Sequence, residues 1–283
     1  MISPSVDYVF GGNQVERDRL LLQAEDYKPE AEWLLNQIGI ENGWRAGDMG
    51  CGPIGILDLL SERVGETGTV VGIERDSRFA DMAKGEVARR GLVNVTIIEG
   101  DALGTTLPMG SFDFMHERLV LVNMPLENQK AFVAQMVALV RPGGSIALEN
   151  VDRASLVCHP ECHSWSILND VFRDAVRITN GDGNAGRTLP WLLRSSGITE
   201  IRTKVHVRAL EVGEHRRTFF LDHLELLRPR ILAIGNLTEI EFDTHTAALA
   251  EHLADPATLL IDRLFVQAWG RKSSGQPTAN VSY

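Results

Sequence analysis

A glycine-rich stretch with an acidic residue ahead of it is the part of this 283-residue chain most suited to chemistry. Residues 48–55 read Asp-Met-Gly-Cys-Gly-Pro-Ile-Gly, so that Gly50, Gly52 and Gly55 have the G-x-G-x-x-G spacing. Glycine lacks a Cβ, which lets backbone approach a ligand closely, and the helix expected next offers free N–H groups. With a short strand carrying Asp48, the stretch predicts the floor of a nucleotide-type pocket. A tight strand-to-helix turn without a ligand is the alternative.

Two more acidic residues follow the next two predicted strands. Residues 69–74 read as a short buried strand ending in Glu74, about twenty residues after the glycines, where a carboxylate commonly holds a ribose hydroxyl pair. Such a carboxylate fits enzymes that use NAD and enzymes that use S-adenosylmethionine. A third strand, residues 95–98, precedes Asp101, which can accept a hydrogen bond from an adenine amino group. This third acidic position favours S-adenosylmethionine.

Five motifs occur in a fixed order: D-M-G-C-G-P-I-G, V-V-G-I-E at 70–74, I-I-E-G-D-A at 97–102, F-D-F-M-H-E-R at 112–118 and L-V-R-P-G-G at 139–144. Together they resemble a class I S-adenosylmethionine-dependent methyltransferase of the small-molecule type related to the ubiquinone and menaquinone pathway enzymes. The resemblance implies S-adenosyl-L-methionine as the cofactor. It also implies these cofactor-binding residues in the core: Asp48, Gly50, Gly52, Glu74, Arg75, Asp101, Ala102, Glu117 and Arg118.

The segment ahead of the glycine-rich stretch reads as helical. Residues 16–23 have the pattern E-x-x-R-L-x-x-Q and follow an aromatic-glycine start. In the resembled enzymes such a helix lies over the cofactor, which implies that Tyr8, Arg19 and Gln23 face its methionine end. The alternative is an ordinary amphipathic surface helix with a solvated charged face.

Strands that alternate with helices predict an α/β fold. We expect a Rossmann-like, seven-stranded, mostly parallel sheet with helices on both faces, and the resemblance implies that its last strand is antiparallel. Ligands of such sheets bind beyond the carboxyl ends of the strands, where Asp48, Glu74, Asp101 and Arg118 all fall. We expect four regions: an N-terminal helical lid (1–40), a cofactor-binding core (41–150), the completion of the sheet with a C-terminal helical insertion that binds the acceptor (151–271), and a tail (272–283).

Histidines are natural candidates for a general base, which methyl transfer needs only when the acceptor loses a proton. Residues 157–163, Val-Cys-His-Pro-Glu-Cys-His, follow the fifth predicted strand, and we expect them to pass over the carboxyl edge of the sheet. His159 and His163 would then lie nearest the donor methyl, and they are the predicted catalytic residues. The same run resembles a zinc site, but a proline interrupts it and no second ligand pair follows, so we expect no metal.

Composition bounds the partners and the compartment. The net charge of −10 and the pI near 5.3 disfavour a nucleic-acid partner, since no Lys/Arg run stands out either. No basic region precedes an apolar core at the N-terminus, and no window approaches the ~18 apolar residues of a membrane helix. Three cysteines argue against a disulfide framework. We therefore expect a soluble, cytoplasmic protein without a membrane partner, and we leave open whether it forms a homo-oligomer.

The sequence thus predicts methyl transfer from S-adenosylmethionine to O, N or C of a small molecule, in specialised metabolite biosynthesis. Two alternatives remain. One is an NAD-dependent oxidoreductase, which Asp48 and the Glu-Gly-Asp-Ala run at 99–102 disfavour. The other is a non-catalytic protein that binds S-adenosylmethionine without a competent acceptor pocket.

Overall fold

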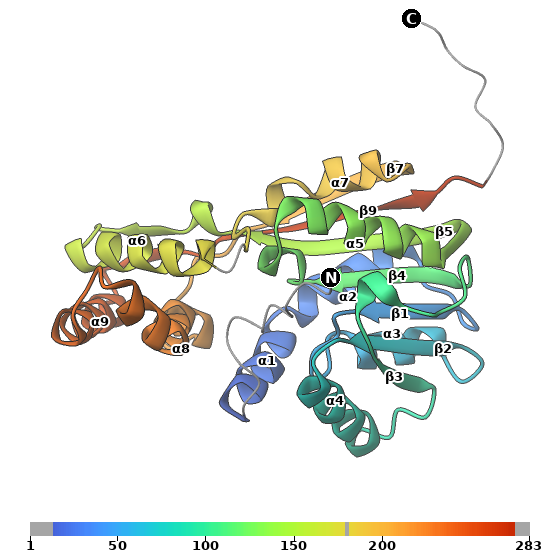
Figure 1. The fold of residues 1–283 in the computed structure, drawn as a ribbon, viewed down its shortest axis with the longest axis horizontal. Coiled ribbons are helices and arrows are strands. Elements are labelled where there is room, and N and C mark those ends of the chain that lie inside the picture. Colours follow the sequence, from blue (N-terminus) through green and yellow to red (C-terminus); the bar gives the residue numbers. More distant parts are fainter. Residues whose placement is uncertain (1–13, 179–180, 275–283) are drawn as a thin grey trace, which may run out of the picture.

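A computed structural model describes residues 14–178 and 181–274, and a seven-stranded sheet forms the centre of those residues (Figure 1). The strand order is β3-β2-β1-β4-β5-β9-β7. Its strands are β1 (Arg45–Met49), β2 (Thr69–Glu74), β3 (Val95–Glu99), β4 (Phe112–Arg118), β5 (Val140–Asp152), β7 (Ile198–His206) and β9 (Leu264–Lys272). β9 runs antiparallel to β5 and β7, and the other neighbouring pairs are parallel. The predicted Rossmann-like sheet with its antiparallel last strand is confirmed.

Helices cover both faces of this sheet because successive strand residues point to opposite sides. On β4, Phe114 packs with α2 (Lys28–Ile38) and α3 (Leu57–Val64) on one face. Met115 packs with α5 (Leu126–Leu139) and α7 (Leu189–Ser195) on the other. α4 (Ser77–Arg89) lies beside β2 and β3, and α1 (Gln14–Asp26) precedes α2.

Three further helices form a lobe that extends from one end of the sheet (Figure 1, left). α6 (His163–Arg177), α8 (Phe219–Ile234) and α9 (Glu239–Ala254) share a hydrophobic cluster of their own that includes Phe172, Leu224 and Phe242. A two-stranded sheet of β6 (Val157–His159) and β8 (Leu259–Ile261) belongs to this helical lobe. β5 and β9, paired along their length, lead from the main sheet into it.

The structure differs from the sequence-based expectations at some element boundaries and in the small second sheet. The apolar run at residues 259–270 reads as a single strand in the sequence but forms two, β8 and β9, with a break at Asp262 and Arg263. The partner of β8, the short strand β6, was not predicted. The helix expected after the glycine-rich stretch begins at Leu57, so that Pro53 lies in the turn before it. In the ranges that the structure describes, no helix has the length and apolar character needed to cross a bilayer.

Candidate active site

The glycine-rich loop joins β1 to α3 and places its backbone at the carboxyl edge of the sheet. Gly50, Gly52 and Gly55 have positive φ angles of 80°, 53° and 51°. A Cβ at Gly52 would meet no atom within 4 Å, whereas one at Gly55 would clash with the Asp48 carboxylate. Glycine is therefore needed at Gly55 for internal packing, while Gly52 presents open backbone that a ligand can approach.

Two carboxylates stand beside this loop at the ends of neighbouring strands. Glu74 ends β2, and its two oxygens accept hydrogen bonds from the backbone N–H groups of Gly52 and Asp76, each at 2.9 Å. Burial raises the pKa of Glu74 above its ordinary value. Asp101 follows β3, is exposed, and accepts from the Leu103 N–H at 2.9 Å. A carboxylate offers about four acceptor positions, so both residues keep capacity for ligand hydroxyl or amino groups.

Asp48, which the sequence predicts to bind the cofactor, is a buried residue whose contacts in the structure are inside the protein. It is 2% exposed, and one of its oxygens lies 2.8 Å from His116 Nδ1, while the other accepts from the Ile56 N–H at 3.2 Å. His116 Nε2 in turn lies 3.4 Å from Glu149 Oε2. Burial alone would lower the pKa of His116, but the two carboxylates outweigh it and raise that pKa to about 9. Asp48 thus fixes the loop from beneath.

The polar chain that starts at Asp48 continues across the sheet. Gln267 donates to Glu149 Oε1 at 2.7 Å and to the Glu30 carbonyl at 2.8 Å. Gln267 Oε1 lies 2.8 Å from His206 Nε2. Side chains from β1, β4, β5, β9 and β7 are therefore connected on the face that α2 covers. Buried polar groups need such partners, and this accounts for His206 as a paired rather than a catalytic histidine.

Glu117 and Arg118 support the site from behind. Glu117 is fully buried, accepts from Asn150 Nδ2 at 2.6 Å and from the Val120 N–H at 3.2 Å, and burial raises its pKa to about 8. Arg118 Nη2 donates to the Gly55 carbonyl at 3.0 Å. Contact of either residue with the cofactor stays a prediction.

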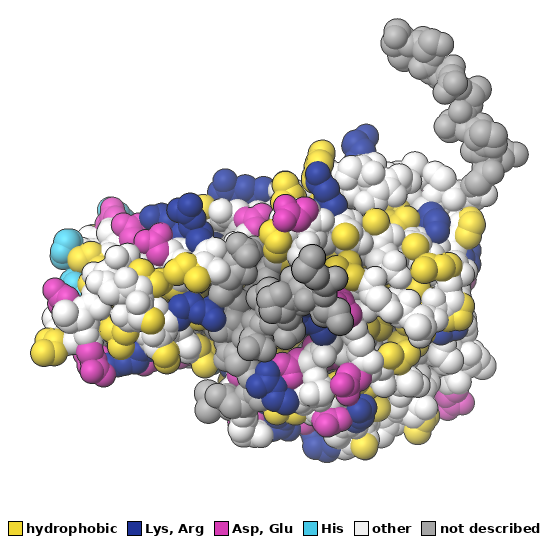
Figure 2. Space-filling view, in the orientation of Figure 1, with side chains coloured by type: hydrophobic (Ala, Val, Ile, Leu, Met, Phe, Trp, Pro, Cys, Tyr) yellow, Lys and Arg dark blue, Asp and Glu magenta, His cyan; other side chains and the backbone are white. Residues whose placement is uncertain are grey.

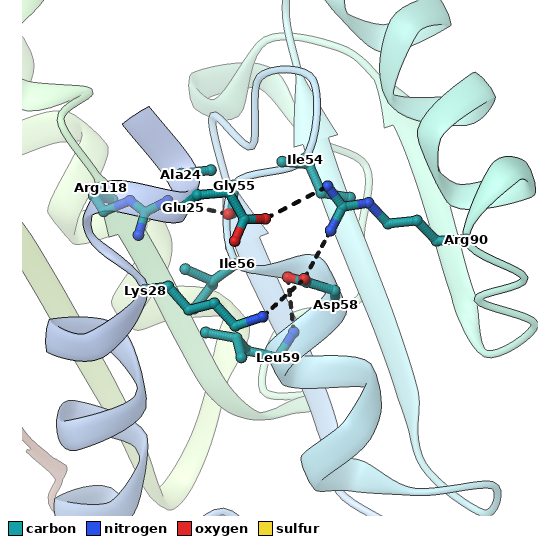
Figure 3. A pocket seen from close by; sticks show the side chains of 10 residues that line it. All are labelled: Ala24, Glu25, Lys28, Ile54, Gly55, Ile56, Asp58, Leu59, Arg90 and Arg118. Carbon is teal, nitrogen blue, oxygen red and sulfur yellow. Dashed lines mark hydrogen bonds and ion pairs between the residues drawn. The ribbon is translucent and has the colours of Figure 1, made fainter. Parts of the chain in front are cut away.

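A small cavity lies behind the loop, between α1, α2 and the start of α3 (Figure 3). Arg118 borders it on one side, and on the other Arg90 pairs with Asp58 at 2.8 Å and approaches Glu25 at 3.9 Å. Its volume of about 10 Å³ corresponds to a single water molecule. It is too small for an organic ligand, so these charged side chains brace the loop.

Of the three N-terminal residues predicted to face the cofactor, the structure describes two, Arg19 and Gln23. Arg19, 7% exposed, donates two hydrogen bonds of 2.7 Å to Glu16 and one of 2.9 Å to Gln23, and lies 3.4 Å from His223 on α8. Arg19 and Gln23 therefore contact each other next to the helical lobe. Tyr8 lies outside the described residues.

Two further residues predicted to bind the cofactor lie near the carboxylates. Arg75 is exposed directly after Glu74, and Ala102 is buried at the start of a 3₁₀ turn, Ala102–Gly104.

The structure does not bring His159 and His163 to the carboxyl edge. β5 continues to Asp152, and the chain then enters the helical lobe, where His159 pairs with Leu259 across β6 and β8. His163 is exposed at the start of α6, with its ring 5.9 Å from that of His245. The route expected over the sheet edge is not the route taken, because β6 finds its hydrogen-bond partner inside the lobe. The base role predicted for these two histidines gains no support from their positions.

Comparison with known proteins agrees with this geometry. Residues 47–144 match a family described as "Methyltransferase domain". The chain is 35% identical over 143 residues to nocamycin O-methyltransferase of Saccharothrix syringae, covering 50% of this chain and 49% of that protein. It is 26% identical over 123 residues to a demethylmenaquinone methyltransferase of Geobacillus sp. (strain WCH70), covering 44% and 52%. The chain spans about half the length of these curated relatives.

Solved structures share the fold. A putative sarcosine dimethylglycine methyltransferase from Galdieria sulphuraria superposes with a TM-score of 0.54 at 16% identity, covering 91% of this chain and 88% of that one. Phosphoethanolamine N-methyltransferase 2 of Haemonchus contortus superposes with a TM-score of 0.53 at 15% identity, covering 86% and 52%. This chain carries a class I S-adenosylmethionine-dependent methyltransferase domain. The family resemblance predicted from the five motifs is confirmed.

The main sheet meets the helical lobe at the carboxyl end of β5 (Figure 1), and the residues at that junction were not predicted from the sequence. Tyr27 is fully buried, with its ring 4.4 Å from that of Phe265 and 4.3 Å from the Arg216 guanidinium. Arg153 and Arg263 lie at the same junction, at the ends of β5 and β9. No local motif marks them, because they meet only through strand pairing. A signal that could have located Arg263 is the change from charged to apolar residues along Asp262-Arg263-Leu264-Phe265.

Proposed function

We propose that the chain transfers a methyl group from S-adenosylmethionine to a small-molecule acceptor. The observation that carries the proposal is the meeting of open backbone at Gly52 with the carboxylates of Glu74 and Asp101 at one edge of a methyltransferase sheet. Glu74 suits a ribose hydroxyl pair, and Asp101 suits the adenine amino group. When bound, S-adenosylmethionine supplies a methyl group on a sulfonium centre.

The residues of the chain serve mainly to position the reactants. An acceptor atom must lie in line, ~3 Å from the methyl carbon, and such positioning supplies most of the rate gain. Asp48 and Arg118 fix the glycine-rich loop, which limits its movement during transfer. The ends of β4 and β5 face the helical lobe, and we assign the acceptor to this side.

The nature of the acceptor is supported by similarity alone. One relative is named for O-methylation of nocamycin, and others are named for methylation of demethylmenaquinone. Both acceptors are small molecules, which favours a small acceptor here and is consistent with specialised metabolism. On the face shown in Figure 2, Lys/Arg and Asp/Glu side chains of the described residues are interspersed over the surface, which does not favour a nucleic-acid partner.

The cofactor assignment is tested with Glu74→Ala. Hydrogen bonds to a charged group contribute about 1.5–3 kcal/mol, so we expect S-adenosylhomocysteine affinity to fall about 10- to 100-fold by calorimetry. Glu62→Ala, an exposed carboxylate on α3, is the matched control and should bind like the original chain. Equal affinity in Glu74→Ala and the original chain would contradict the assigned ribose contact.

Turnover separates an enzyme from a non-catalytic binding protein. Labelled S-adenosylmethionine is incubated with the full chain and a panel of small phenols, carboxylic acids, amines and quinols, and label transfer is measured. We expect transfer to at least one class. Tight S-adenosylhomocysteine binding without transfer to any class would favour the non-catalytic alternative.

A further inference from the structure

Two arginines face each other where the sheet joins the helical lobe. Arg153 opens a 3₁₀ turn, Arg153–Ser155, directly after β5, and Arg263 directly precedes β9. The last antiparallel pair of these strands is Asp152 with Leu264, so Arg153 and Arg263 are the next opposed positions. Like charges directly opposite each other on antiparallel strands destabilise the pairing.

The nearby carboxylates are engaged elsewhere. Asp262 lies 2.7 Å from Arg216 Nη2, and Asp152 lies 2.7 Å from Arg187 Nε. Within residues 14–178 and 181–274, neither Arg153 nor Arg263 has a carboxylate within ion-pair distance. Arg263 is 7% exposed with its Nε–H buried and unpaired, and Arg153 has a buried, unpaired Nη2. Arginine keeps its proton in proteins, so the junction holds excess positive charge with donors that lack acceptors.

Burial is the largest cause of the pKa shifts of Arg153 and His223 at this junction, and neighbouring positive charges add to it. Burial, together with Arg263, holds the pKa of Arg153 well below its ordinary range. Burial and the positive charges of Arg19, Arg263 and Arg153 hold the pKa of His223 well below its ordinary value. For Arg263 itself, burial opposes the charge, but Tyr27 and Asp262 offset it and raise the pKa.

Aromatic rings fix the orientation of Arg153. Its guanidinium carbon lies 3.5 Å from the centroid of the Phe172 ring and 4.9 Å from that of Phe220. Stacking of this kind holds the guanidinium plane, while its N–H groups project from the edge, the arrangement in which arginine binds carboxylate or phosphate with two hydrogen bonds. The junction therefore combines a planar donor set with an aromatic wall.

We propose that Arg153 and Arg263 bind an oxyanion group, carboxylate or phosphate, of the acceptor molecule, whose apolar part lies beside Phe172 and Phe220. The site lies at the carboxyl end of β5, on the lobe side of the sheet edge that carries Glu74 and Asp101. Its use as an acceptor site rests on the proposed methyl transfer. Binding of an oxyanion there can be tested separately.

The test is the melting temperature of the full chain in sodium benzoate, sodium phosphate or benzamide, at ionic strength matched with chloride. At ~10-fold excess over its Kd, we expect benzoate to raise Tm by about 3 °C, while the neutral analogue benzamide does not. A shift with phosphate alone would assign a phosphate-bearing acceptor. No shift with either anion beyond that with benzamide would overturn the proposal.

Variants of Arg153 and Arg263 test whether the anion binds at these two residues. Arg153→Met should abolish the anion shift and melt in chloride no lower than the original chain, because it removes one of two opposed charges. Arg263→Lys keeps the charge but loses the planar guanidinium group. We expect the apparent Kd for the anion, obtained from the Tm shift at several anion concentrations, to rise at least tenfold. Arg173→Met, an exposed position on α6, is the control and should keep the shift. Retention of the full shift in Arg153→Met would contradict the proposal.

S-adenosylhomocysteine is measured with each protein to separate the two claims. We expect it to stabilise the original chain and Arg153→Met equally. If neither anion raises the Tm of the original chain but S-adenosylhomocysteine does, the oxyanion site alone is overturned. Absence of the stabilisation in the original chain would contradict the proposed function.

Discussion

Asp48 uses both carboxylate oxygens inside the protein, one toward His116 and one toward the start of α3. The sequence motif located this residue correctly at the glycine-rich loop, because motif and loop are local in the chain. Its partners could not be predicted, since His116 and Glu149 reach it only through the pairing of β1, β4 and β5. The same limit explains why Arg153 and Arg263 were missed.

His116 makes stability depend on pH. Its pKa is raised to about 9 in the folded protein, against ~6.5 in an unfolded chain. The stabilisation from its charged form is therefore fully present below about pH 6.5 and is lost as the pH rises through 9. Urea unfolding at steps between pH 6 and 9.5 should show a falling free energy of unfolding.

Glu117 contributes in the same direction, because burial raises its pKa to about 8 and so disfavours its ionised form in the folded state. Its contribution is present at pH values below about 4.5 and is lost as the pH rises through 8. Glu117→Gln removes this part and should leave the part due to His116. Unfolding free energies of Glu117→Gln that do not change between pH 6.5 and 9 would contradict the charged state assigned to His116.

At the scale of elements, α1 connects the sheet domain to the helical lobe. Arg17 pairs with Glu86 on α4 at 2.7 Å, and Arg19 lies 3.4 Å from His223 on α8. The lid role predicted for this region was drawn from resemblance and stays a prediction. These contacts are consistent with it, since a helix so placed can shield the transfer from water.

Deletion of residues 1–25 tests this role. The strands, α2 and the lobe core keep their packing, so we expect a folded protein with turnover reduced at least tenfold. Deletion of residues 275–283 is the matched control and should leave turnover unchanged. Transfer by the 1–25 deletion at the original rate would show that the lid role is wrong.

Element order was predictable where hydrophobic periodicity was strong, as in β2, whose predicted bounds of residues 69–74 match the structure. The pairing of β6 with β8 was not, because each is three residues long and they lie about a hundred positions apart in the chain. That pairing carries His159 away from the sheet edge. The seven strands of the main sheet were thus predicted, whereas the course of the chain after β5 was not.

At the scale of the whole molecule, residues 14–178 and 181–274 form two hydrophobic bodies, the sheet with its helices and the helical lobe. If the lobe supplies the acceptor side, loosening it should reduce turnover and spare cofactor binding. Phe242→Ala, at a fully buried position in the lobe, should cost about 3–5 kcal/mol of local stability and lower turnover, with S-adenosylhomocysteine affinity within about twofold.

Phe114→Ala, equally buried but beneath the glycine-rich loop, is the counterpart and should weaken S-adenosylhomocysteine binding. Methyl-transfer assays and calorimetric titration with S-adenosylhomocysteine on both variants test whether the donor and acceptor sides are separate. Equal loss of cofactor affinity in the two variants would argue against separate donor and acceptor sides.

We propose that the carboxyl edge built from Gly52, Glu74 and Asp101 binds S-adenosylmethionine rather than a nicotinamide dinucleotide. Calorimetric titration of the full chain with S-adenosylhomocysteine and with NAD tests it most directly. We predict saturable binding of S-adenosylhomocysteine at one site per chain and no measurable binding of NAD at the same concentrations. Saturable binding of NAD without binding of S-adenosylhomocysteine would contradict the account.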